Sequence, residues 1–220
     1  MKTKFNLIGW ALLAILFLGC SSSKITSSWK SDSETPAKFN KILVVGLMVE
    51  PDRTLREKME LHLVNDLLNH GIYAVSAENE FGPKAFEKLN EKEALQKLEK
   101  SGFDAVLTIV LLNKTKEKYY TPGYINNTPY RLHQDQFWNY YLLMRDRIYT
   151  EGYYSETTKY FWESNLFNIS GKKLLYSVQT QSFDPASAES LAHEYGLLII
   201  GDIVKKEILG NPENPVQKAF

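Results

Sequence analysis

Residues 41–75 read KILVVGLMVEPDRTLREKMELHLVNDLLNHGIYAV, and this stretch decides the fold. Residues 41–47 form an apolar, β-branched run, which is typical of a strand buried on both faces. Apolar residues then recur at helical spacing as far as Leu68, and Gly71 ends the segment. A second short apolar run follows at 72–75. The stretch therefore predicts a strand, a helix and a second strand, in that order.

The sequence on the C-terminal side continues this pattern. It predicts a helix at 91–100, a strand at 103–112, two hairpin strands at 158–169 and 173–183 around Ser170-Gly171, and a long helix from Asp184 to Leu209. Right-handed crossovers would make the first strands parallel, whereas the hairpin is antiparallel. We therefore expect an α/β fold with a mixed sheet, made from a β-α-β-α-β start, the hairpin and the long C-terminal helix. An aromatic-rich extended insertion at 119–157 lies before the hairpin.

The N-terminal residues have the pattern of a secretion signal. Lys2 and Lys4 precede an uncharged apolar run at 7–18, which is shorter than the roughly 20 residues needed to span a bilayer. The end of this run, followed by Gly19 and Cys20, resembles the lipobox of bacterial lipoproteins, in which signal peptidase II cuts before a lipid-modified cysteine. We therefore expect residues 1–19 to be a lipoprotein signal peptide.

Cys20 is the only cysteine in the chain, so it has no intramolecular disulfide partner, and acylation explains it better than redox chemistry. No acidic residue follows it, which by resemblance to enteric lipoproteins favours the outer membrane, with the protein facing the periplasm. Residues 20–39 are predicted to be the lipid anchor and a flexible polar tether, reaching roughly 25 Å from the bilayer. A single domain at 40–210 and a loose tail at 211–220 complete the predicted organisation.

Several segments together resemble a family of uncharacterised bacterial lipoproteins. They are FNKILVVGL, LREKMELHLVNDLLNHGIYAV, GFDAVLTIVL, WESNLFN with GKKLLYSVQTQSFDP, and the closing helix. The fold of that family is similar to the N-terminal domain of the Tol system's β-propeller protein and to curli-secretion-type lipoproteins. The resemblance covers residues 28–209. It implies a fold and a cell-envelope address, and no activity, because the family is uncharacterised.

Arg56 and Glu60 stand four residues apart inside the apolar arc of the first predicted helix. Because an unpaired buried charge is costly, we expect each to compensate the other. The family resemblance also implies an Arg and a Glu at this spacing. One interpretation is an anion or partner site at the start of the helix. The sequence favours the other, a structural ion pair at the edge of the sheet.

Glu163 and Asn165 alternate with Phe161 and Phe167 on one face of the predicted hairpin, so we expect them on the face that packs on the core. A carboxylate in such a place can have a perturbed pKa and mark a functional site. A hydrogen bond to the backbone or to a tyrosine hydroxyl would explain Glu163 without any function. The sequence favours this structural explanation.

Tyrosine is concentrated in one region: ten of the thirteen lie between Tyr119 and Tyr160. The near repeat of YYTPGY at 119–124 and IYTEGYY at 148–154 predicts two similar turns that bring tyrosines together. Tyrosine suits interfaces and sugar stacking, but cross-strand aromatic pairs also stabilise a hairpin. We expect a scaffold first and a contact surface second. The candidate binding residues are Tyr120, Tyr124, Trp138, Tyr153 and Tyr154.

Other classes of function have little support. Basic and acidic residues balance at 26 each and form no basic stripe, so nucleic acid is not an expected partner. No motif for a nucleophilic hydrolase, a metalloprotease, a phosphate or a dinucleotide occurs, so neither a cofactor nor catalysis is expected. His62, Asp66 and His70 follow at four-residue steps, but the outer two are about 12 Å apart on a helix, too far for one metal ion. They are predicted to lie on a solvated face.

The sequence therefore predicts a lipid-anchored, non-enzymatic interaction or assembly module of the bacterial cell envelope. Its expected partners are the membrane, through the acyl anchor, and an envelope protein or glycan. A glycan-binding lipoprotein that uses the tyrosine-rich surface is the alternative, and an unidentified hydrolase is the third.

Overall fold

The computed structural model of the chain describes residues 22–32, 35–84, 86–123, 137–138, 141 and 151–210. The chain divides into two compact units, each with its own internal contacts. Unit 1 comprises residues 1–114 and 159–220, and unit 2 comprises residues 115–158. The predicted insertion at 119–157 lies within unit 2. Among the described residues, no helix is long and apolar enough to span a membrane.

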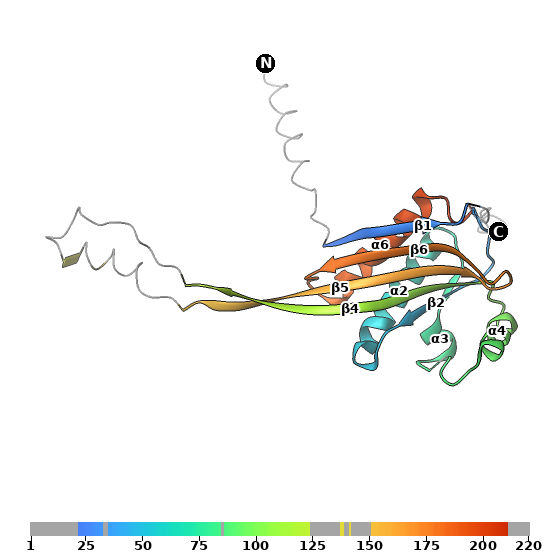
Figure 1. Ribbon diagram of the computed structural model, residues 1–220, viewed down its shortest axis with the longest axis horizontal. Coiled ribbons are helices and arrows are strands. Elements are labelled where there is room, and N and C mark those ends of the chain that lie inside the picture. Colours follow the sequence, from blue (N-terminus) through green and yellow to red (C-terminus); the bar gives the residue numbers. More distant parts are fainter. Residues whose placement is uncertain are drawn as a thin grey trace, which may run out of the picture. The chain divides into compact units, whose positions relative to one another are not determined.

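The strands form one sheet with the order β1-β6-β5-β4-β2-β3 (Figure 1). The elements are β1 (Ser23–Lys30), β2 (Ile42–Leu47), η1 (Glu50–Asp52), α2 (Arg53–Asn69), β3 (Ala74–Ser76), α3 (Ala77–Phe81), α4 (Glu91–Lys100), β4 (Ala105–Thr121), β5 (Tyr153–Asn168), β6 (Lys173–Phe183) and α6 (Ala188–Lys205). Strand β2 pairs in parallel with β3 and β4, whereas β6 pairs antiparallel with β5 and β1. The predicted α/β fold with a mixed sheet and a long C-terminal helix is confirmed.

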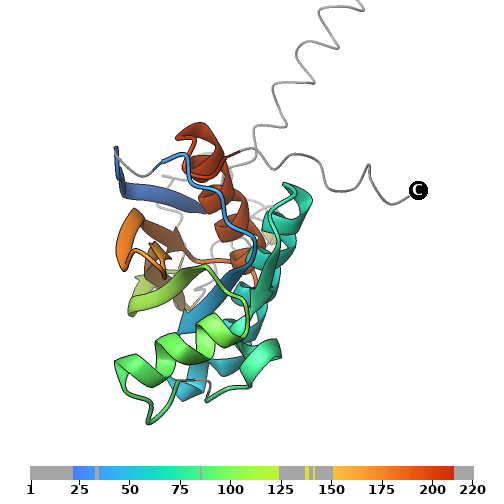
Figure 2. The same cartoon turned by 90° about the vertical axis from the view of Figure 1, so that its right-hand side faces the viewer.

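Helices cover the two faces of the sheet unequally. Helices α2 and α6 lie side by side on one face of the sheet (Figure 2). The larger core joins them to inward side chains of β2, β4, β5 and β6, with Trp162 and Tyr195 among its largest members. A smaller core on the other face joins α3 and α4 to Leu43 and Val45 of β2. Because a buried strand alternates its side chains between faces, β2 serves both cores. The chain thus leaves β2 and β3 toward opposite faces of the sheet.

The predicted flexible tether is wrong for residues 23–30, because these residues form the edge strand β1. Ser28 of β1 pairs with Val178 of β6, and its carbonyl oxygen accepts a hydrogen bond from Lys206 Nζ at 3.0 Å. Ser28 Oγ and Tyr176 Oη both donate to the carboxylate of Asp202. The polar sequence of this strand hides its role, since its partners come from β6 and α6, far away in the chain.

The C-terminal helix is shorter than predicted at both ends. Ser187, not Asp184, caps it, because the Ser187 side chain accepts from the Ser190 N–H while Ser190 Oγ accepts from the Ser187 N–H. The helix ends at Lys205, and Leu209 instead forms a bridge with Ala37.

Candidate functional site

Glu60 ties together the ends of two parallel strands. Its carboxylate accepts hydrogen bonds from Gly46 N–H at 2.7 Å, Ser76 Oγ at 2.6 Å and Glu78 N–H at 3.0 Å. These donors come from β2, β3 and α3, so one side chain of α2 fixes three neighbouring elements. Glu60 is 2% exposed, and this burial raises the pKa of its carboxyl although all three hydrogen bonds lower it.

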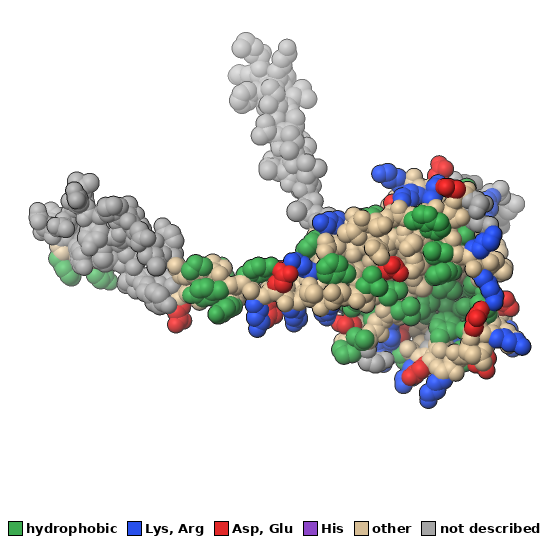
Figure 3. Space-filling model, in the orientation of Figure 1, with side chains coloured by type: hydrophobic (Ala, Val, Ile, Leu, Met, Phe, Trp, Pro, Cys, Tyr) green, Lys and Arg blue, Asp and Glu red, His purple; other side chains and the backbone are tan. Residues whose placement is uncertain are grey.

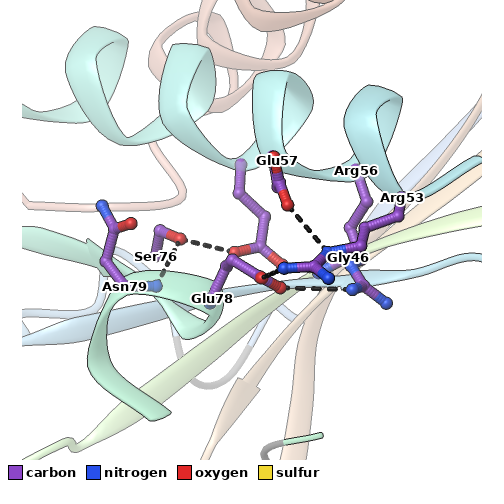
Figure 4. A network of polar contacts seen from close by, with 8 residues as sticks. Gly46, Arg53, Arg56, Glu57, Ser76, Glu78 and Asn79 are labelled. Atoms are coloured by element: carbon purple, nitrogen blue, oxygen red, sulfur yellow. Dashed lines mark hydrogen bonds and ion pairs between the residues drawn. The ribbon is translucent and has the colours of Figure 1, made fainter. Parts of the chain in front are cut away.

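Arg56 is also buried, but it does not pair with Glu60 as predicted. Its Nη2 donates to Glu78 at 3.2 Å, and Arg53 Nη2 donates to the same carboxylate at 3.0 Å (Figure 4). Arg53 further bonds Glu57 at 2.9 Å. The prediction that Arg56 pairs with Glu60 is therefore wrong. Arg56 pairs with Glu78, and the Glu60 carboxylate accepts its hydrogen bonds from backbone N–H groups and a hydroxyl group. The real counter-ion, Glu78, lies on the short helix α3, which the sequence did not reveal.

Gly46 is required where β2 passes under α2. A Cβ added there would lie 2.5 Å from Cγ of Arg56, closer than Cβ atoms in proteins come to other atoms, and a tight 3.1 Å from Glu60 Oε1. The bare backbone lets the aliphatic part of Arg56 lie flat on the strand. It also lets the Gly46 N–H reach Glu60.

A cavity of about 620 Å³ opens beside this cluster. Its lining residues are Val45, Gly46, Leu47, Met48, Arg56, Glu60, Ala77, Glu78, Gly82, Pro83, Lys84, Phe86 and Glu87. Arg56 is 7% exposed, and its Nε is cut off from solvent with no hydrogen-bond partner among the described residues. The cavity thus combines apolar walls with charges of both signs and one unused buried donor.

The candidate aromatic residues that the structure describes in unit 2 are exposed. Tyr120 is 55% exposed, Trp138 63%, Tyr153 64% and Tyr154 72%, and hydrophobic side chains lie on the surface of the described part of unit 2 (Figure 3). Tyr124 lies outside the described residues. Exposure alone does not distinguish a scaffold from a contact surface, because cross-strand aromatic pairs stabilise a hairpin while their rings stay exposed.

Two of the aromatic pairs in the described part of unit 2 include these residues. Tyr120 and Tyr154 come from β4 and β5, and their ring centroids are 5.1 Å apart with the planes inclined by 49°. A Cβ at Gly152 would collide with the hydroxyl of Tyr120, so this ring lies against the glycine backbone. Trp138 stacks on Tyr141 with centroids 5.4 Å apart and planes 17° apart. Each pair presents two rings to solvent.

Glu163 and Asn165 do not face the core as predicted. The buried side chains of β5 are Trp162, Ser164 and Leu166, so the alternate set lies on the opposite face. Glu163 accepts hydrogen bonds from Asn165 Nδ2 at 2.9 Å and Gln179 Nε2 at 3.0 Å. It is paired with Gln179 across the strands, and the register of β5 against β6 shifts between Leu166 and Phe167. Amide donors satisfy this carboxylate, and nothing marks it as a reactive group.

The row of His62, Asp66 and His70 along α2 and its C-terminal cap is only partly exposed to solvent. His62 Nε2 lies 2.5 Å from Glu189 Oε1, and its ring meets that of His193 edge to face. Asp66 instead points Oδ2 at Gly196 of α6, where this oxygen is buried and has no hydrogen-bond partner among the described residues. Within the described residues, no three acidic, cysteine or histidine side chains are placed to hold a metal ion.

Cys20, the predicted lipidation site, lies outside the described residues. No protein-family model and no curated protein matches this chain. Lipoprotein GNA1162 from Neisseria meningitidis is similar in structure, with 17% identity, coverage of 75% of this chain and 98% of that one, and a TM-score of 0.42. The PelC dodecamer from Paraburkholderia phytofirmans matches at 11% identity over 80% of this chain and 95% of that one, with a TM-score of 0.41. A lipoprotein is thus among the similar structures, as the sequence resemblance implies, but at these scores neither likeness bears on what this chain does.

Proposed function

We propose that this protein is a lipid-anchored, non-enzymatic interaction or assembly module of the bacterial cell envelope, held at the outer membrane and facing the periplasm. An acyl group on Cys20 is the anchor, and a protein partner contacts the exposed aromatic side chains of unit 2. The observation that carries the proposal is that Tyr120, Tyr153, Tyr154 and Trp138 are each more than half exposed.

Exposed aromatic clusters are unusual on a surface that contacts only water. Each ring keeps apolar area in solvent, at about 25 cal/mol for every Å² that a partner could cover. Tyrosine and tryptophan are enriched at interfaces because they offer a large contact area with few rotatable bonds. The tilted pair of Tyr120 and Tyr154 presents such an area from two neighbouring strands.

The short distance between the anchor and the fold supports a position close to the membrane. Only Ser21 and Ser22 separate Cys20 from β1, and three residues of fully extended chain span at most about 10 Å. Ser22 N–H and Oγ both donate to Glu194 of α6, at 3.1 and 2.7 Å, so the chain is already tied to unit 1 there. An acylated Cys20 would therefore hold unit 1 near the bilayer surface.

The anchor is tested with Cys20→Ser. We expect the wild type to incorporate radiolabelled palmitate and to sediment with membranes, and the variant to do neither. A variant that stays in the membrane fraction, together with an unlabelled wild type, would remove the anchor from the proposal.

The contact surface is tested by photo-crosslinking in intact envelopes. A photoreactive phenylalanine analogue replaces Tyr154 or Trp138 in unit 2, and Tyr73 serves as the matched control, since it is 55% exposed and belongs to unit 1. We expect one discrete adduct from the two unit 2 positions and none from the control. Equal adducts from all three positions, or none from any, would contradict a specific partner at unit 2.

Glycan binding is the second candidate, and the stacked pair of Trp138 and Tyr141 favours it. Two stacked, nearly parallel and exposed rings offer a flat aromatic face on which a sugar ring can stack. On an array of envelope glycans, saturable binding that Trp138→Ala abolishes, without any protein adduct, would establish this function in place of the first.

A further inference from the structure

The cavity of unit 1 lies where α/β folds commonly bind ligands. Gly46 and Leu47 line it at the carboxyl end of β2, and Ala77 and Glu78 line it just after β3. Beyond these strand ends, α2 packs on one face of the sheet and α3 on the other. A crevice opens at the carboxyl ends of parallel strands when the chain departs to opposite faces. Its volume of about 620 Å³ is typical of small-molecule sites.

Arg56 supplies a buried positive charge to the lining of this cavity. The side chain is more than nine-tenths buried, and it bonds one carboxylate oxygen of Glu78 through Nη2. Glu78 is shared with Arg53, and Glu60 accepts from three other donors, so neither carboxylate belongs to Arg56 alone. The Nε atom is closed off from solvent, so a ligand group can add a counter-ion only at the part of Arg56 that lines the cavity.

The charges around the cavity restrict what that group can belong to. Arg56 and Lys84 are the cationic lining residues, whereas Glu60, Glu78 and Glu87 are anionic. A phosphate dianion would be repelled by three carboxylates. A single carboxylate could bind Arg56, provided that its molecule also carries a cationic group for the acidic side. Lys84 Nζ lies 3.4 Å from Glu87 at the exposed rim, where an incoming ammonium group can take its place.

We infer that this cavity binds a small zwitterion of the amino acid or short-peptide class. The ligand's carboxylate pairs with Arg56, its ammonium group faces Glu78 or Glu87, and its side chain lies against Met48 and Phe86. This site belongs wholly to unit 1 and does not depend on the aromatic residues of unit 2.

The inference is tested by titrating the full chain, in detergent, with four probes while recording backbone amide NMR shifts. Glycyl-leucine carries both charges, its N-acetyl derivative only the carboxylate, its amide only the ammonium group, and inorganic phosphate is the anion control. We expect saturable shifts at Gly46, Glu78 and Gly82 with glycyl-leucine and at least about tenfold weaker binding of the amide, because the bond to Arg56 is lost. The N-acetyl derivative should bind with intermediate affinity.

Two variants assign the site. Arg56→Gln should weaken glycyl-leucine binding about tenfold or more. Because Arg56 is buried and this variant can unfold, Lys84→Gln provides a second test at a side chain that is 71% exposed, with the surface substitution Lys100→Gln as the matched charge control. Removing the Lys84 charge releases Glu87 for the ligand's ammonium group, so glycyl-leucine binding should strengthen severalfold, whereas the control should change nothing. No shift at about 10 mM glycyl-leucine, tighter binding of phosphate, or unchanged binding by a folded Arg56→Gln would each overturn the inference.

Discussion

Tyrosines of unit 1 and of unit 2 occupy opposite environments. Tyr176 and Tyr195 of unit 1 are fully buried, and each hydroxyl has a partner: Asp202 at 2.8 Å and Ser164 at 2.5 Å. Burial raises the pKa of both hydroxyls above the ordinary value. Tyr120 and Tyr154 of unit 2 are more than half exposed and contact each other instead.

This difference shows that residue type alone does not distinguish a tyrosine that stabilises the fold from one that forms a contact surface. A buried tyrosine contributes apolar area and a satisfied hydroxyl to stability, so the fold depends on it. An exposed pair contributes little to stability and remains available to a partner. Substitutions should therefore separate the two regions by the size of their effect on unfolding.

The largest effect is expected at Tyr195 of unit 1. Tyr195→Ala removes a ring that packs on Trp162 at 5.6 Å, and should lower the free energy of unfolding by about 3–5 kcal/mol. Tyr195→Phe keeps the ring and should lose about 1 kcal/mol, because only the bond to Ser164 disappears. Urea unfolding measures both values. If Tyr195→Ala lowered the free energy of unfolding by less than Tyr195→Phe does, the contrast between buried and exposed tyrosines would be wrong.

The next effect is the coupling between Arg56 and Glu78. A double-mutant cycle with alanine at both positions should give an interaction of about 1 kcal/mol or more, since Glu78→Ala removes the hydrogen-bond partner of the buried Arg56 guanidinium, while Arg56→Ala leaves Glu78 paired with Arg53 alone. The same cycle for Arg56 and Glu60 should give a smaller value, because these side chains share no hydrogen bond. Equal couplings in the two cycles would show that the cluster acts as one unit and not through the observed pairs.

The sequence contains enough information for the main elements of unit 1. Apolar runs and helical spacing predict β2 and α2 because these elements are buried, and burial imposes periodicity. Strand β1 is an edge strand rich in serine and lysine, so it carries no such period, and only its pairing with distant β6 makes it a strand. The face of β5 was misassigned for a similar reason. Phe161 and Trp162 are both aromatic, so the residue types do not decide which of them faces the core. The register also shifts between Leu166 and Phe167, and no residue pattern in the sequence marks that irregularity.

The sequence shows the Arg56 cluster only in part. Arg56 and Glu60 are visible because charged residues interrupt an apolar arc. Glu78 is invisible because it lies on a five-residue helix without periodicity. Its role depends on the parallel pairing of β2 with β3, which brings Ser76 beside Val44. Local patterns can flag a buried charge, but its partner is fixed by tertiary structure.

A smaller effect is expected at Asp66, which belongs to unit 1 but lacks a hydrogen bond for its buried oxygen among the described residues. Desolvation raises its pKa above 3.8, while His193, His62 and His70 lower it. A carboxyl group with a raised pKa in the folded state favours folding only when it is protonated, below that pKa. At neutral pH Asp66 is ionised, and its buried charge lowers the free energy of unfolding. Asp66→Asn should therefore increase stability at pH 7 by less than about 1 kcal/mol.

The gain from Asp66→Asn should shrink as pH falls. Protonation of Asp66 removes the buried charge from the wild type, while Glu189 keeps His62 paired on its outer side. Thermal unfolding from pH 7 to pH 4 measures this, with exposed Asn65→Asp on the same helix as a control for helix charge. A gain that is constant with pH would mean that ionisation of Asp66 plays no part.

The smallest effect on stability is expected at Tyr154 of unit 2. Its ring is 72% exposed, so Tyr154→Ala loses part of one contact with Tyr120 and should change the free energy of unfolding by no more than about 0.5 kcal/mol. The ion pair of Lys118 with Glu156 gives a matched control, because it joins the same two strands at 3.0 Å and is also exposed. Lys118→Ala should have an equally small effect on unfolding.

The two variants should then differ in envelope crosslinking. If the tyrosine serves a partner, Tyr154→Ala weakens capture of the crosslinked partner and Lys118→Ala leaves it unchanged, although both proteins are equally stable. If Tyr154→Ala lowered the free energy of unfolding much more than Lys118→Ala does, Tyr154 would be a structural residue like Tyr195. The difference between the two units would then be one of degree, because solvent-exposed rings of unit 2 would also be holding its strands together.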